Sequence, residues 1–370
     1  MDELALAERL IAYDTSKDDG LRAAAEFVKG RLEQQGVRVE SRDHDGLPIL
    51  IAEAGPASGP LVVFHGHLDV VPAFAEQFVP RVEGDRLIGR GAYDMKGALA
   101  AMVCAVSDAG RQDSVRVRLI CVPDEESENV ESRSTDMLVK EGIAADFAIT
   151  GEPTNLHIGV QAKGVLALRL EVEGVAAHGS TPWLGDNAIL KAHDIFRRIE
   201  TLPFSRQSSD LFDRPSINLA RVVGGDAFNK VPDRCQIDVD IRYLPGQDPE
   251  LILEQIGRIA DLRVIRKFHR VPAIVSRQNE YVLALRAAVG SFVEGEALSI
   301  GRDGASDAIS FLEAGIPAVE FGPEGGGHHG PTEWVSLSSL TTYRKALGAF
   351  VADLPNHLAG QAQSLRAVEG

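Results

Sequence analysis

The 370-residue sequence contains little cysteine and fewer basic than acidic residues. Its three cysteines, Cys104, Cys121 and Cys235, lie in apolar segments without a CxxC pair, which indicates buried small side chains in a reducing compartment and excludes a thiolate-rich structural zinc site. The 38 basic and 54 acidic residues give a net charge of −16, and no basic run interrupts that balance. This charge argues against nucleic acid or an anionic membrane as a partner.

Long apolar segments are also missing from the chain. No segment reaches the ~18 consecutive apolar residues of a membrane-spanning helix. The N-terminus carries acids and a helical apolar spacing, where a signal peptide would need a basic start and an unbroken apolar stretch. We therefore expect a cytoplasmic protein with no membrane partner, built as one large domain with a second attached.

Strand and helix patterns alternate in the two outer parts of the chain. The short apolar runs 61–64 and 147–149 are typical of strands buried on both faces of a parallel sheet, and 97–109 is typical of an alanine-rich helix. This alternation predicts an α/β fold with a mostly parallel sheet covered by helices. We assign residues 1–163 and 271–370 to this discontinuous domain.

Residues 164–270 show a different order of patterns. Signals for strand, helix, strand, strand, helix and strand follow one another there. This is the β-α-β-β-α-β order of a ferredoxin-like α+β domain. We therefore predict that this segment is a self-contained domain inserted into the larger one.

Imidazole and carboxylate side chains recur directly after predicted strands. They fall in 65–69, 124–126, 151–153 and 328–329, and Asp94 lies in a separate glycine-rich segment. Because ligands bind at the carboxyl ends of strands in open α/β sheets, we expect the four segments to meet in one crevice. Histidine and carboxylate ligands without a nearby thiol suit zinc, cobalt or manganese.

Simpler explanations stay open for single residues. A lone histidine on a strand, such as His65, is more often a satisfied core residue than a ligand. Glu125 and Glu126 could form a solvated charge cluster, although adjacent carboxylates directly after a buried strand repel each other unless a cation or a proton separates them. The segment around Asp94 lacks the last glycine of a dinucleotide loop, and the chain has neither a P-loop nor a G-x-S-x-G serine motif.

An ordered set of segments resembles one metallopeptidase family, that of acetylornithine deacetylase, succinyl-diaminopimelate desuccinylase and glutamate carboxypeptidase. The segments are FHGHLDVVP, GRGAYDMKGALA, VPDEES, TGEPT, AAHGSTPWLGDNAI, DIRYLPG and FGPEGGGHHGPTEWV. The resemblance runs from the first predicted helix to about Leu354. It implies a metal-binding catalytic domain with two zinc ions, for which cobalt or manganese can substitute, and an inserted domain that mediates homodimerisation.

The resemblance also implies a set of metal ligands. On matching positions, Asp94 would bridge the two ions. His67 and Glu152 would complete one site, and Glu126 and His329 the other.

Further roles follow from the same resemblance. Glu125 resembles the general base, and Asp69 would orient the His67 imidazole by accepting its second N–H. His178, in the inserted domain, resembles the histidine that stabilises the tetrahedral oxyanion, often from the partner subunit.

Two positions of the inserted domain match those that hold the substrate in this family, Asn229 and Arg242. Arg242 would clamp an α-carboxylate through both ends of its planar guanidinium. The alternative is a solvent-facing arginine on an alternating strand.

The chain departs from the family pattern in two places. First, residues 127–132 after the acidic pair contain no glycine, so we expect a different loop there, in which Glu128 is a competing candidate ligand. Second, the segment from Arg302 to Asp307 carries charges that we expect to face the substrate. Our leading hypothesis is a dizinc amidohydrolase acting on an N-acyl amino acid. A dipeptidase or carboxypeptidase with the same machinery, or a non-catalytic relative that binds metal or peptide, are the alternatives.

Overall fold

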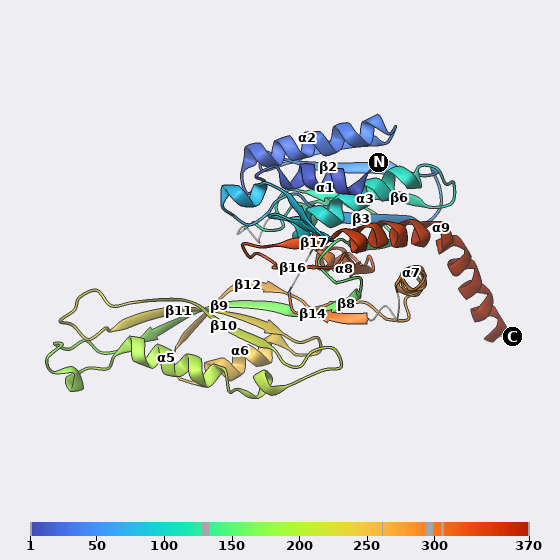
Figure 1. The fold of residues 1–370 in the computed structure, drawn as a ribbon. Coiled ribbons are helices and arrows are strands. Elements are labelled where there is room, and N and C mark those ends of the chain that lie inside the picture. Colours follow the sequence, from blue (N-terminus) through green and yellow to red (C-terminus); the bar gives the residue numbers. More distant parts are fainter. Residues whose placement is uncertain (1, 128–132, 261, 294–298, 305–306, 369–370) are drawn as a thin grey trace. The chain divides into compact units, whose positions relative to one another are not determined.

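A computed structural model of the chain describes residues 2–127, 133–260, 262–293, 299–304 and 307–368. These residues form two compact units (Figure 1). The first comprises Met1–Val160, Val275–Ile300 and Ser306–Gly370, and the second comprises Gln161–Ile274 and Gly301–Ala305. The segment predicted as an inserted domain, 164–270, lies within the second unit. None of the described helices has the length and apolar character needed to cross a membrane.

A nine-stranded sheet forms the centre of the first unit, and some residues at one of its edges, 161–162, 273–274 and 301–302, belong to the second unit. Its order is β1-β2-β6-β3-β7-β15-β8-β13, and β14 pairs with β8 outside this path. The strands are β1 (Arg38–His44), β2 (Leu47–Ala54), β3 (Leu61–His67), β6 (Arg116–Val122), β7 (Phe147–Thr150), β8 (Ile158–Ala162), β13 (Ala273–Ile274), β14 (Ser299–Arg302) and β15 (Ala318–Glu320). Every residue of β3 and β7 is buried, as their continuous apolar runs predicted.

Strand direction changes from the middle of the sheet to its edges. The four central strands, β6, β3, β7 and β15, run parallel, which confirms the predicted fold class. At the edges, β1, β2 and β6 pair antiparallel, and so do β15, β8 and β13. The β1–β2 hairpin turns at Asp45 and Gly46, whose φ angles of 53° and 82° are those that a two-residue type I′ turn requires.

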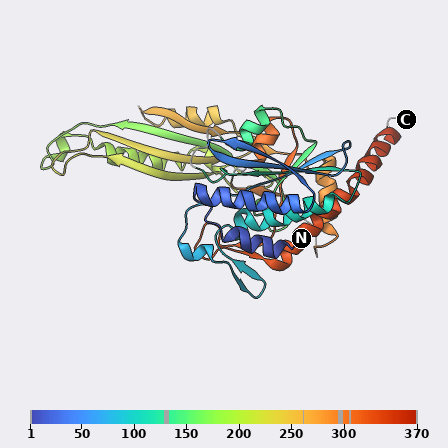
Figure 2. The same ribbon diagram turned by 90° about the horizontal axis from the view of Figure 1, so that it is seen from above.

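Helices cover the sheet on both faces. The helices of this unit are α1 (Glu3–Ile11), α2 (Asp18–Gln34), α3 (Gly97–Ala109), α4 (Ser134–Lys140), α7 (Glu280–Gly290), α8 (Ala308–Glu313) and α9 (Leu337–Val368), with the short 3₁₀ helix η1 (Ala75–Phe78). Figure 2 shows the N-terminal helices, in blue, together on one side of the sheet. Helix α3 contacts β3 and β6 as well as α1 and α9, and its small alanine side chains let these elements approach closely. Helices α4 and α8 place Leu138 and Phe311 in a cluster with Val63 and Ile120 of the sheet.

Helix α9 contains a proline. It continues through Pro355 to Val368. Proline removes one backbone donor and disturbs one turn, but here the helix resumes after it.

A small four-stranded sheet joins two distant parts of the first unit. Its order is β16 (Gly325–Gly326), β17 (Trp334–Ser336), β5 (Arg86–Ile88) and β4 (Arg81–Glu83). Because β17 pairs with β5, the chain after β15 is held beside the chain that precedes Asp94. This pairing brings together two of the chain segments that form the candidate site.

The second unit has the β-α-β-β-α-β order. Its elements are β9 (Gly164–Glu173), the 3₁₀ helix η3 (Pro182–Leu184), α5 (Ala188–Ile199), the 3₁₀ helix η4 (Pro203–Arg206), β10 (Ser216–Gly224), β11 (Arg234–Tyr243), α6 (Pro249–Gly257) and β12 (Arg263–Arg270). The sheet order is β10-β11-β9-β12, with antiparallel pairing throughout. Asn187 starts α5, since its side chain accepts hydrogen bonds from the backbone N–H of Ile189 at 3.0 Å and of Leu190 at 3.3 Å.

Candidate metal centre

The histidine and carboxylate side chains lie at the carboxyl ends of the parallel strands. His67 is the last residue of β3, Glu126 follows β6, and Glu152 follows β7. His329 lies after β15, between β16 and β17. Asp94 lies in η2 (Ala92–Lys96), a single turn in which its own backbone is not helical.

Asp94 is the side chain on which three histidines converge. Its Oδ1 lies 3.0 Å from Nε2 of His67, and its Oδ2 contacts Nε2 of His328 and lies 3.5 Å from Nε2 of His329. Nε2 of His329 also lies 2.8 Å from Oε1 of Glu126. One ligand atom each from His67, Asp94 and Glu126 lies within 4.8 Å of the others, and the same holds for Asp94, His328 and His329.

The titration behaviour of these groups matches a cation site. Burial alone would raise the pKa of Asp94, but the three histidines hold it well below its ordinary value. Burial alone would lower the pKa of His67, yet the carboxylates of Asp69 and Asp94 raise it well above its ordinary value. Hydrogen bonds to Asp94 and Glu126 raise the pKa of His329 to about 10. Protons on His67 and His329 thus offset the charge of the carboxylates that they contact, and a divalent cation can take the place of these protons.

Glu152 provides a second test of the fit. Its carboxyl is buried, and burial, together with the negative charge of Asp94, raises its pKa well above the ordinary value. A cation beside both carboxylates would remove this penalty. The donor set of imidazoles and carboxylates therefore suits a zinc-type ion.

Asp69 connects two of the ligand segments. Its Oδ1 lies 3.4 Å from Nδ1 of His67, and its backbone oxygen lies 3.0 Å from the same nitrogen. Its carboxylate also accepts hydrogen bonds from the backbone N–H of Glu125 at 3.2 Å and of Glu126 at 2.7 Å. Asp69 thus holds the acidic loop as well as the imidazole, a function that we did not predict.

Glu125 contacts a buried polar network that the sequence did not reveal. Arg133 Nη1 donates to Oε1 of Glu125 at 2.8 Å and to Oδ1 of Asp307 at 3.2 Å. Oδ2 of Asp307 accepts a hydrogen bond from Thr135, whose Oγ1 lies 2.9 Å from Nε2 of His65. Asp307 has no exposed side-chain surface, so it does not face a substrate as expected. His65 is a buried core residue, as the simpler explanation has it: Nε2 contacts Thr135, Nδ1 has no hydrogen-bond partner among the described residues, and burial lowers its pKa to about 4.

The candidate residues of the second unit are arranged within that unit. The backbone N–H of Gly179 donates to the carbonyl of Asn229 at 2.7 Å, which brings Asn229 beside the His178 segment. Nδ1 of His178 accepts from the backbone N–H of Ser180 at 3.2 Å, so the neutral imidazole carries its proton on Nε2. Arg242 lies on β11, half-buried, with Nε donating to both carboxylate oxygens of Asp240 at 3.1 and 3.0 Å.

Two further expectations concern the departures from the family pattern. Glu128, the competing ligand, lies outside the described residues. Arg302 lies in β14. The neighbouring Asp303 forms an ion pair with Lys163, with 2.7 Å between Oδ1 and Nζ.

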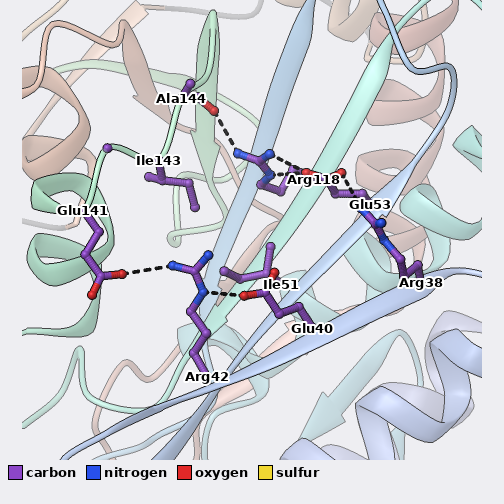
Figure 3. A pocket seen from close by; sticks show the side chains of 10 residues that line it. Arg38, Glu40, Arg42, Ile51, Glu53, Arg118, Glu141, Ile143 and Ala144 are labelled. Carbon is purple, nitrogen blue, oxygen red and sulfur yellow. Dashed lines mark hydrogen bonds and ion pairs between the residues drawn. The ribbon is translucent and has the colours of Figure 1, made fainter.

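A separate cavity of about 300 Å³ opens on β1, β2 and β6 of the first unit (Figure 3). It is lined by Arg38, Glu40, Arg42, Ile51, Glu53, Arg118, Glu141, Gly142, Ile143 and Ala144. Arg42 pairs with Glu40 at 2.6 Å and Glu141 at 3.0 Å. Arg118 donates to Glu53 at 2.7 Å through Nε. The charges of this cavity are therefore balanced among its own side chains, and we assign no ligand to it.

The fold and the histidine–carboxylate cluster together define a metal-dependent hydrolase. The sequence of residues 63–353 matches the family model of peptidase family M20/M25/M40, and the chain belongs to this family. It is therefore a hydrolytic enzyme that acts on amides, in a family of metallopeptidases that use divalent metal ions. The expected cytoplasmic location stays a prediction.

Curated relatives agree with this membership, and a solved structure shares the fold. The chain is 27% identical over 375 residues to a succinyl-diaminopimelate desuccinylase of Shewanella pealeana, with 95% of this chain and 97% of the relative covered. It is 29% identical over 378 residues to one of Halorhodospira halophila, with 96% and 98% covered. Its fold is similar to that of the M20 family metallo-carboxypeptidase Sso-CP2 from Sulfolobus solfataricus, with a TM-score of 0.77, 20% identity and coverage of 96% and 100%.

Adjacent histidines at the cluster allow a direct test of the ligand set. His329 contacts both Asp94 and Glu126, and its backbone has a φ of 58°, a strained conformation that is typical of functional sites. Among the carboxylates of the described residues, His328 contacts Asp94 alone. We expect His329→Ala to lower the metal content of the protein and His328→Ala to leave it unchanged, as measured by atomic emission after dialysis. An equal loss in both variants would contradict the assignment of His329.

Proposed function

We propose that the protein is a dizinc-dependent hydrolase that cleaves the amide bond of an N-acyl amino acid, of the succinyl-diaminopimelate desuccinylase or acetylornithine deacetylase type. The observation that carries the proposal is the adjacency of Glu125 and Glu126. Glu126 contacts His329 of the cluster, whereas Glu125 contacts Arg133 and stays outside the ligand groups. Two curated relatives that span nearly the whole chain are desuccinylases by name, which supports this substrate class.

The proposed ligands are His67, Asp94, Glu126, Glu152 and His329. Bound divalent ions would supply Lewis-acid chemistry, which lowers the pKa of a water molecule and polarises the scissile carbonyl. Glu125 would take the proton of the attacking water and pass it to the leaving amine. Arg133 engages Oε1 of Glu125, so we assign the proton transfer to the second oxygen, Oε2.

The second unit would supply the remaining groups. The Nε2–H of His178 would donate to the oxyanion that forms at the attacked carbonyl. Arg242 would hold the substrate carboxylate, with Asn229 beside it. Asp240 engages only Nε of Arg242, which leaves the two terminal nitrogens to face a carboxylate in a bidentate pair.

The role of Glu125 is tested by Glu125→Gln. Since a positioned base contributes about 10²- to 10⁴-fold to the rate, we expect kcat to fall by that factor while both metal ions stay bound. Glu126→Gln is the matched control, and should lose metal as well as activity. Substrates to screen with added zinc or cobalt are N-succinyl-diaminopimelate, N-acetyl-ornithine and dipeptides. Dipeptides as the only substrates hydrolysed by the parent protein would overturn the acyl-amino-acid assignment in favour of a peptidase.

The carboxylate clamp is tested by comparing two arginines of the same sheet. Arg242 pairs with Asp240, and Arg169 of β9 pairs with Asp238 at 2.7 Å, with similar exposure of the two side chains. A charge-assisted pair contributes about 1.5–3 kcal/mol. We therefore expect Arg242→Ala to raise KM for a carboxylate substrate about 10- to 100-fold and Arg169→Ala to leave it unchanged. An unaltered KM in Arg242→Ala would rule out the clamp.

We also propose that the chain forms a homodimer through the second unit. Strand β10 is the edge of its sheet, and Val222 and Val223 on it are each 48% exposed. Leu190 of the neighbouring helix α5 is 66% exposed. An apolar edge strand of this kind offers unpaired backbone groups to another chain.

Sedimentation velocity tests the dimer. We expect Val222→Lys to shift the protein toward the monomer, because a charge is placed in the contact. Val82→Lys is the control, since Val82 is equally exposed, at 47%, but lies in the first unit. A monomeric parent protein would disprove the proposed assembly.

A further inference from the structure

We propose that Arg90 and Glu333 form a positioning pair that holds the Asp94 and His329 segments in register and thereby sets the metal affinity of the site. The inference rests on the proposed metal centre. Neither residue is among the ligands or the base, and both lie in segments whose other residues carried the family resemblance.

The hydrogen bonds of this pair go directly to the ligand segments. Oε1 of Glu333 accepts from the backbone N–H of Tyr93 and of Asp94, each at 3.0 Å. Its Oε2 accepts from Nη1 of Arg90 at 2.6 Å. Nη2 of the same arginine donates to the backbone carbonyl of His329 at 2.9 Å. One carboxylate and one guanidinium therefore connect Asp94 to His329 across more than 230 positions of the chain.

The backbone around Asp94 needs these acceptors. Asp94 has φ −118° and ψ 98°, so η2 does not continue as a regular helix at this point. Backbone N–H groups outside regular structure have to find another acceptor when they are buried. Glu333 provides it with one oxygen for two donors, and leaves the Asp94 carboxylate to the histidines.

The small sheet fixes Glu333 itself. Glu333 directly precedes β17, whose Trp334 is paired with Ile88 of β5. Its backbone carbonyl accepts from the N–H of Gly89 at 2.9 Å. The carboxylate is thus delivered to Asp94 from a paired strand and not from a free loop.

Stability alone does not account for such a pair. The Arg90 and Glu333 side chains are only 4% and 1% exposed. A buried ion pair pays a desolvation penalty that often exceeds its Coulomb attraction, so it is weak evidence for a stabilising role. The other side-chain hydrogen bonds of the pair all end on segments with a proposed metal ligand, and one of them holds the carbonyl of His329, whose φ is positive. Positioning explains this choice of partners.

The test measures metal affinity, which does not depend on the substrate. In Glu333→Gln the amide has the same size as the carboxylate but only one acceptor oxygen. If that oxygen accepts from the backbone N–H groups, the amide nitrogen faces the Arg90 guanidinium, donor against donor. If the oxygen instead faces Arg90, the backbone N–H groups lose their acceptor. Groups that orient metal ligands contribute about 10- to 100-fold to metal affinity. We expect that loss for zinc, measured on stripped protein by competition with a chromophoric chelator, together with a changed absorption spectrum of the cobalt-loaded protein.

A second variant and a control accompany it. Arg90→Lys keeps the charge, but a single ammonium cannot reproduce the forked contact to Oε2 and to the His329 carbonyl, so the same loss is expected. Glu324→Gln changes an exposed glutamate of the same segment and should bind zinc as the parent does.

The outcomes separate this inference from the proposed function. Parent-like zinc affinity in both Glu333→Gln and Arg90→Lys would overturn the positioning pair, and so would loss of the fold in both, because that result assigns the pair to folding. A parent protein that binds no metal would overturn the metal centre and the pair with it. A parent that binds two ions but cleaves no acyl amino acid would overturn only the proposed function, and the loss of affinity in the variants would still support the pair.

Discussion

Several carboxyl groups are buried together at the ends of the parallel strands, and their charge has to be balanced. Asp94, Glu125 and Glu152 meet where the parallel strands end, and each is largely withdrawn from water. Ionised carboxylates are tolerated in such a place only with a nearby cation. In the structure, His67 and His329 have raised pKa values and their positive charge balances Asp94, whereas burial raises the pKa of Glu125 and of Glu152 and favours their neutral form. Divalent metal ions would supply more positive charge in a smaller volume than protonated histidines. The carboxyl groups that the strand ends bring together would therefore favour binding of a cation.

The groups behind the cluster connect segments that the chain itself keeps apart. Asp69 joins the end of β3 to the acidic loop through two backbone N–H groups. Arg90 and Glu333 join the turn of Asp94 to the segment of His329. In each case a charged side chain bonds to the backbone of a ligand segment, so a ligand's position is fixed without its own polar atoms being used. The cluster is thereby held by a frame that does not compete with the metal.

Local sequence patterns predicted much of this architecture, but they did not predict which distant segments pair with one another. The buried runs of β3 and β7 and the alanine-rich α3 were identified because the pattern of each element lies within a few consecutive residues. The antiparallel edges were not, since a strand's pattern does not encode its direction. Likewise, the contact between Arg133 and Asp307 joins residues 174 positions apart, and no spacing rule links them. Arg90 and Glu333 stood inside the family-like segments, but only the fold shows that they meet.

The two adjacent glutamates of the acidic loop have different surroundings. Their peptide groups are held by the same residue, Asp69, yet their side chains have different partners. Glu126 lies against His329, whereas Glu125 lies against Arg133. Burial raises the pKa of Glu125 well above its ordinary value, and the positive charge of Arg133 opposes that shift. A carboxylate in this setting combines a high proton affinity with a fixed orientation, and these are the properties that the proposed general base requires.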